Sequence, residues 1–90
     1  MNPAIILDLA TSVQMPEDGT ISRTIHQSDD VKAIVFGFSA GQELSEHTAS
    51  MPATLHFISG RAQVTLGDES IEAEAGTWVH MPAHLPHSIR

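Results

Sequence analysis

The chain has 90 residues, no cysteine and a formal net charge of −7, from 11 acidic and four basic side chains. A domain of this length has a marginal core, so copies of the chain are expected to associate, and so few basic residues exclude a nucleic-acid backbone as a direct partner. The lack of cysteine excludes disulfides and thiolate metal ligands, and the apolar run 4–9 is too short for a membrane span, which favours a cytoplasmic protein.

The first part of the chain contains a predicted edge strand and a predicted hairpin. Residues 4–9 are apolar apart from Asp8, which suits a short strand at the edge of a sheet. Residues 20–26 and 31–38 are rich in β-branched and aromatic side chains, and the polar cluster 27–30 between them has the composition of a turn. We therefore predict an antiparallel hairpin over residues 20–38.

The next part begins with a long segment that has no periodic pattern. Residues 39–51 are predicted to form a loop, and loops of this length in compact domains are frequently functional. Residues 55–58 and 77–81 are short apolar runs that end at Ser59-Gly60 and at Pro82. Each of these two runs predicts a short strand.

A second hairpin is predicted between those two strands. Residues 62–66 and 71–75 both alternate between apolar and polar side chains, which is typical of a strand with one buried face. Gly67 and Asp68 between them supply the turn, because glycine readily adopts positive φ.

The predicted elements define an all-β fold. Seven or eight short strands with frequent turns form a sandwich or a barrel, and either arrangement hides sheet edges that would otherwise pair with other chains. An immunoglobulin-like sandwich is the alternative, although the buried cysteine pair of that fold is missing here. We expect residues 1–90 to form one domain.

Two segments carry glycine, histidine and proline at a characteristic spacing. Residues 41–60 begin and end with glycine and contain His47, and residues 76–87 read Gly-Thr-Trp-Val-His-Met-Pro-Ala-His-Leu-Pro-His. The two segments resemble the first and second motifs of the cupin family, with His84 in place of a glycine of the second motif. This resemblance covers about residues 39–90. It implies a double-stranded β-helix, or jelly-roll barrel, of short antiparallel strands around a central pocket.

The resemblance also implies a metal site from which this chain departs. In the family, a His-x-His pair, a glutamate and the last histidine of the second motif bind a divalent metal. The corresponding residues here are His47, Ala49, Ala53 and His87. Because a divalent site usually has at least three protein donors, His47 and His87 are candidate ligands that lack a third.

Each remaining histidine can be assigned to a strand face or a turn. His80 is the candidate third ligand, on the same strand face as Trp78; the alternative is a histidine packed beside that indole and hydrogen-bonded to the backbone. If residues 53–58 form a regular strand, His56 lies opposite the position of the missing glutamate, on the exterior or in a subunit contact. Solvent exposure is expected for His26 and His84.

Other side chains near the motifs fit either a role in a binding site or an ordinary structural role. Met51, Phe57 and Trp78 would line an apolar pocket, although such residues more commonly fill a core. Glu43 and Glu46 near His47 would serve as an acid, a base or a ligand, although acidic loop residues are usually solvated. No nucleophile-elbow pattern or phosphate-binding loop is present, so no catalytic residue is assigned.

Two main functions stay open at this point. One is a small cupin that binds a divalent metal (Zn, Ni, Fe or Mn) and acts on or senses a small polar molecule; the resemblance implies dioxygenase, isomerase or lyase chemistry. The other is a metal-free small-molecule-binding or regulatory module, which the two alanines support. Family members continue after the second motif into one or two more strands, so the final strands are expected to be absent. Absence of these strands would leave an open edge on the sheet. We expect either that a second copy of the chain covers this edge in a homodimer, or that the chain is a shortened form.

Overall fold

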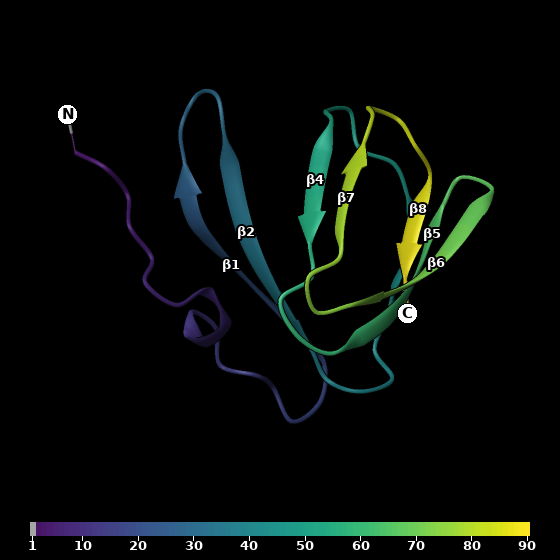
Figure 1. Ribbon diagram of the computed structural model, residues 1–90, viewed down its shortest axis with the longest axis horizontal. Coiled ribbons are helices and arrows are strands. Elements are labelled where there is room, and N and C mark those ends of the chain that lie inside the picture. Colours follow the sequence, from purple (N-terminus) through teal and green to yellow (C-terminus); the bar gives the residue numbers. More distant parts are fainter. Residues whose placement is uncertain (1) are drawn as a thin grey trace. The chain divides into compact units, whose positions relative to one another are not determined.

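Eight antiparallel strands and one short 3₁₀ helix make up the part of the chain described by this computed structural model, residues 2–90 (Figure 1). The all-β class is confirmed, because the three-residue helix η1 (Leu9–Thr11) is the only helical segment among these residues. No helix in this part of the chain has the length and hydrophobicity to cross a membrane. Two compact units divide the chain, one reaching to Gln42 and the other running from Glu43 to Arg90.

The first unit is built on the predicted hairpin. Strands β1 (Thr20–Gln27) and β2 (Lys32–Phe38) pair antiparallel from end to end, with one irregularity in the register between Thr24 and His26. The turn between them is closed by Ser28, whose backbone N–H donates to the carbonyl of Val31 at 2.8 Å. The Ser28 hydroxyl also accepts the backbone N–H of Val31 at 3.2 Å. This polar turn joins two strands of β-branched and aromatic residues, as their composition predicts.

The prediction of an edge strand over residues 4–9 is wrong. The chain there is extended or bent but pairs with no described strand, and the helix η1 begins at Leu9. Asp8 accounts for this change, because its carboxylate accepts the backbone N–H of Ala10 at 3.1 Å and so caps the helical turn. The hydrogen bond from the capping residue therefore favours a helical turn more strongly than the apolar side chains favour a strand.

The segment after η1 packs against β2 at a glycine. A Cβ placed on Gly37 would lie 2.8 Å from the sulfur of Met15 and 3.6 Å from Cγ2 of Val13. The missing side chain therefore lets this segment lie directly on the strand. Val35, two residues earlier on the same strand face, is buried.

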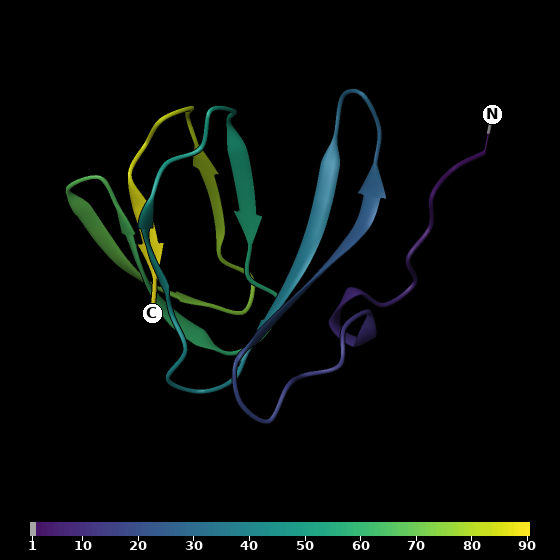
Figure 2. The same cartoon turned by 180° about the vertical axis from the view of Figure 1, so that it is seen from behind.

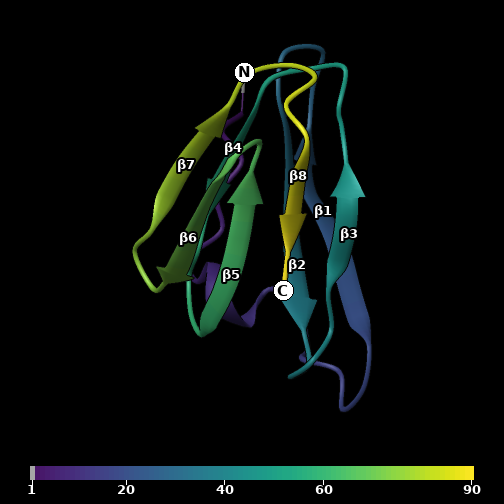
Figure 3. The ribbon, with the colours of Figure 1, turned by 90° about the vertical axis from the view of Figure 1, so that its right-hand side faces the viewer.

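The second unit contains six short strands in two antiparallel sheets. In the larger sheet the strand order is β3-β8-β5-β6, so that β8 lies between β3 and β5 (Figure 2, Figure 3). In the smaller sheet β4 pairs with β7 (Figure 1). The bounds are β3 (Leu44–His47), β4 (Ala53–His56), β5 (Arg61–Leu66), β6 (Glu69–Glu74), β7 (Trp78–Met81) and β8 (His87–Ile89).

Two of these strands differ from the sequence-based expectation. β3 lies inside residues 39–51, which were expected to be a loop, and β8 follows the second motif, where no strand was expected. Strands of four and three residues are too short to show an alternating pattern. β3 and β8 also pair with each other across about 40 residues, and β8 pairs with β5 across more than 20, so no local signal identifies them.

The core of the second unit is small and follows strand alternation. Its buried apolar residues are Val64 on β5, Ala73 on β6, and Val79 and Met81 on β7. Val64 is completely inaccessible to solvent. Side chains of neighbouring residues on these strands are more exposed, because successive residues of a strand point to opposite faces.

The predicted hairpin of β5 and β6 is confirmed, and its two-residue turn depends on Gly67. Gly67 has φ +61°, whereas Asp68 is not among the residues with positive φ, which is the pattern of a type II′ turn. We expect Gly67→Ala to lower the stability by about 1 kcal/mol, because a residue with a Cβ is strained at this φ. The new Cβ would also lie 3.3 Å from Leu85 Cδ1. Thermal unfolding should show a melting temperature lower by roughly 4–8 °C, whereas Asp68→Ala should change it little.

Candidate metal centre

The structure brings His47 and His87 side by side. His47 is the last residue of β3 and His87 is the first residue of β8, and the two are paired in the register of the larger sheet. Their ring centres lie 4.2 Å apart, and the planes of the rings are inclined at 58°. Two imidazoles separated by 39 intervening residues therefore meet at the ends of adjacent strands.

Hydrogen bonds to the backbone determine which nitrogen of each ring is protonated. The Nδ1 atom of His47 lies 2.7 Å from the carbonyl oxygen of Ser45, and that of His87 lies 2.9 Å from the carbonyl oxygen of Leu85. A carbonyl oxygen can only accept a hydrogen bond, so each Nδ1 is the donor and carries the proton. In its neutral form, each ring consequently leaves the lone pair of Nε2 free to bind a metal or to accept a proton.

The two histidines differ in burial. His87 is 6% exposed, whereas His47 is exposed. Among the described residues, no buried side-chain nitrogen or oxygen lacks a hydrogen-bond partner. The Nε2 of His87 has no such partner and must therefore reach solvent. The pair is thus anchored by the buried ring of His87 and open on the side of His47.

The structure does not bring His80 to this pair. In the smaller sheet His80 pairs with Thr54, and its ring stacks beside that of Trp78 with ring centres 6.4 Å apart. Both rings lie on the exposed face of β7, because the alternate residues Val79 and Met81 are buried. This geometry agrees with the stacking beside the indole in the alternative considered for His80, but no hydrogen bond joins its ring to the backbone within residues 2–90. Within residues 2–90, no group of three histidine, aspartate or glutamate side chains lies close enough to hold a metal ion.

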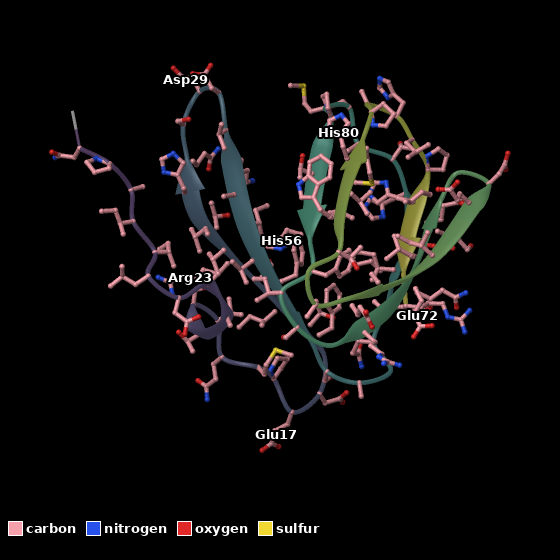
Figure 4. All side chains as sticks on the ribbon, in the orientation of Figure 1. Glu17, Arg23, Asp29, His56, Glu72 and His80 are labelled. Carbon is pink, nitrogen blue, oxygen red and sulfur yellow. The ribbon has the colours of Figure 1, made fainter. Side chains whose placement is uncertain are left out.

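The other histidines also lie away from the pair. His56 pairs with Trp78 and is exposed on the same outer face, as predicted (Figure 4). His26 is exposed on β1. His84 is exposed in the turn before β8 and has φ +67°, a conformation that favours glycine. Its backbone N–H donates to the carbonyl of Ala49 at 2.7 Å, which ties the segment after His47 to the segment before His87.

The three residues expected to line an apolar pocket do not form a common wall. Met51 is 70% exposed and Trp78 is 63% exposed, whereas Phe57 is half-buried. The strand face of Trp78 explains its position, because its neighbour Val79 occupies the buried face. The surface of this unit has instead a broad, open depression on β5 and β6 and beside the residue that follows β8, lined by Arg61, Ala62, Gln63, Glu72 and Arg90.

The carboxylates closest in sequence to His47 have other surroundings. Glu43 forms an exposed ion pair with Arg90, with an oxygen–nitrogen distance of 3.9 Å. Glu46 is exposed, in the part of β3 where the pairing with β8 is irregular. Sequence reasoning did not identify the carbonyls of Ser45 and Leu85, which orient the two rings. Only the repeated spacing of two residues before each histidine would have indicated them.

The known structures most useful for comparison are two bacterial proteins. A conserved protein of unknown function from Streptococcus pyogenes is 32% identical over 99% of this chain and 78% of its own, with a TM-score of 0.84. A cupin superfamily protein from Desulfitobacterium hafniense is 27% identical over 99% of this chain and 82% of its own, with a TM-score of 0.85. A scan of family models and a search of curated proteins find no match.

The antiparallel β architecture and this likeness along almost the whole chain define a cupin fold. The chain belongs to the cupin superfamily, as a small cupin.

Proposed function

We propose that this small cupin binds a divalent metal ion through the Nε2 atoms of His47 and His87, and that a small polar molecule occupies open positions around the ion. The observation that carries this proposal is the paired hydrogen bonding of the two Nδ1 atoms, which leaves the Nε2 lone pair available on each of two neighbouring rings. Metal-binding histidines commonly donate their other ring N–H to a carbonyl in this way.

The spacing of the two rings fits a shared ion. With metal–nitrogen distances of about 2.0–2.1 Å, two imidazoles on one ion have ring centres about 4.5–5 Å apart. The observed 4.2 Å differs from this by less than one ångström. Neutral imidazole suits Zn, Ni and Fe, whereas Mn favours oxygen donors, so the first three are the better candidates for this pair.

Two protein donors leave several coordination positions for water and for a ligand. When bound, the metal would supply a Lewis acid that polarises an oxygen of the small molecule. The buried ring of His87 would hold its position, while the exposed ring of His47 borders solvent, from which the molecule would enter. Alanine at positions 49 and 53 predicts a weaker affinity than a site with three or four donors.

Metal titration of tag-free protein tests this proposal. We expect Zn²⁺ to bind with a stoichiometry of one in calorimetry, and we expect His47→Ala and His87→Ala each to weaken binding at least about tenfold. His56→Ala is the matched control, because it removes an exposed imidazole on a different sheet. Unchanged binding in both site variants would refute the assignment.

The tautomers provide a second test that needs no metal. Long-range ¹H–¹⁵N spectra at a pH where both rings are neutral should show His47 and His87 protonated at Nδ1, because each Nδ1 donates to a carbonyl. Protonation at Nε2 in either ring would contradict the proposed geometry.

A metal-free function is the second candidate, supported by the lack of a third nearby donor among residues 2–90. In that case the two Nε2 atoms would accept hydrogen bonds from a small molecule. Absence of Zn²⁺, Ni²⁺ and Fe²⁺ binding in the parent protein, together with a ligand whose binding is lost in His87→Ala, would favour this candidate.

A further inference from the structure

The larger sheet of the second unit separates its side chains by polarity. Paired residues of antiparallel strands lie on the same face of a sheet, and the register pairs His87 with Leu66 and Leu66 with Glu69. Alternation along β5, β6 and β8 assigns the remaining residues to one face or the other (Figure 3). Apart from His87 and Glu69, the face that carries His87, called here the His87 face, is formed on these three strands by Ala62, Val64, Leu66, Ile71, Ala73 and Ile89.

The opposite face of the same strands is polar. It carries Arg61, Gln63 and Thr65 on β5, together with Ser70, Glu72 and Glu74 on β6. The charged residues of the sheet are thus collected on the side that His87 does not face. A molecule that reaches the histidine pair along the His87 face therefore meets mainly hydrocarbon.

The apolar surface next to His87 is partly open to solvent. Leu66 lies directly across from His87 on β5, and Ile89 lies two residues further along β8. Both are half-buried, whereas Val64 and Ala73 on the same face are buried. The hydrocarbon part of a ligand would remove the exposed part of this surface from water, which favours binding.

The loops that flank the two histidines carry no acidic side chain, lysine or arginine. Residues 48–52 lead from His47 into β4, and residues 82–86 lead from β7 to His87. Their one titratable side chain, that of His84, is exposed. Glu69, the one charged residue that β5, β6 and β8 place on the His87 face, is negative and exposed. No permanent cation is therefore placed to bind a second anionic group of a ligand, and Glu69 would repel one.

We propose that the small molecule of this site is a monoanion with an uncharged, apolar body, such as an aliphatic monocarboxylate. This inference rests on the proposed function, because a divalent ion held by two neutral imidazoles keeps its positive charge and favours an anionic head group. The carboxylate would take open positions on the ion, and the body would lie on Leu66 and Ile89. A second carboxylate, or a row of hydroxyl groups, would lose its water there without gaining a partner.

Three acids with the same carbon chain test the proposal by calorimetry with Zn²⁺-loaded protein. Hexanoate ends in a methyl group, adipate ends in a second carboxylate, and ε-aminocaproate ends in an ammonium group. We expect hexanoate to bind at least about tenfold more tightly than the other two, because only its far end can lie on an apolar surface without losing hydration. Equal binding of the three acids, or a preference for adipate or ε-aminocaproate, would overturn the proposal.

A matched pair of variants locates the apolar body of the ligand. Leu66→Thr removes apolar area across from His87 and should weaken hexanoate binding at least about threefold, with Zn²⁺ binding unchanged. Ile58→Thr makes a comparable change at a 36% exposed position two residues after β4, whereas the loop from His47 enters β4 at its other end. It should leave both affinities unchanged, and circular dichroism checks that both variants are folded. Equal hexanoate binding in the two variants would contradict the proposed position of the body.

Nuclear Overhauser effects give a readout that needs no variant. The terminal methyl group of bound hexanoate should show contacts to the methyl groups of Leu66 or Ile89, whereas contacts to the exposed indole of Trp78 in their place would overturn the proposal. Zn²⁺ binding without a preference for hexanoate would refute this inference alone. Absence of Zn²⁺ binding would refute the proposed function and this inference together.

Discussion

Replacing Ala49 with histidine and Ala53 with glutamate in the same chain is expected to raise the affinity for Zn²⁺ at least about 100-fold. The two substitutions would restore the ligand types that the cupin motif places beside His47 and His87. Ala49 is two residues from His47, and its carbonyl is tied to the backbone of His84 next to the second motif. Ala53 lies on the face of β4 opposite His56, the face that points away from solvent.

Competition with a chromophoric chelator would measure this gain. Each single variant should bind with intermediate affinity, because each adds one donor to the existing pair. Adding His87→Ala to the double variant should lose most of the gain, since the new donors act only together with the original ones. If the double variant binds no more tightly than the parent, positions 49 and 53 do not face the histidine pair.

Val64→Asp is expected to prevent folding. Val64 is 0% exposed on β5 and is paired with Ile71 on β6 and with Ile89 on β8. A carboxylate in this position would have neither water nor a partner, at a cost of several kcal/mol. The total stability of a small domain is only about 5–15 kcal/mol.

Val64→Ala gives a measurable form of the same prediction. Removing two buried methyl groups should lower the stability by about 2 kcal/mol and the melting temperature by roughly 8–16 °C. Val31→Ala is the control, because Val31 is 56% exposed in the turn between β1 and β2 and its substitution should cost under about 0.5 kcal/mol. Equal effects of the two substitutions would show that Val64 is not at the centre of the core.

Much of the fold could be predicted because its signals are local. The alternation in residues 62–66 and 71–75 identified β5 and β6, and Gly67 identified their turn. The composition of residues 20–38 identified the first hairpin in the same way. The cupin resemblance rested on spacings within two short segments, and the likeness to solved structures confirms it.

The candidate site could be predicted only in part. Motif spacing selected His47 and His87, but strand alternation around Trp78 was not enough to tell which face of β7 points inward. His80 was therefore considered as a third ligand, whereas the burial of Val79 and Met81 places it outside.

The sequence by itself determined the all-β class and the hairpins, because those features depend on neighbouring residues. The two paired histidines were selected by their resemblance to the cupin motifs, which depends on short spacings within two segments. Tertiary structure alone decided the pairing of β3 with β8, the capture of each Nδ1 by a carbonyl and the outward direction of Trp78. The strand pairing and the direction of Trp78 depend on contacts between segments distant in the chain, and the strands that make them are too short to carry a pattern of their own. The carbonyls that accept from the two Nδ1 atoms lie only two residues before each histidine, but no side chain marks a backbone acceptor in the sequence.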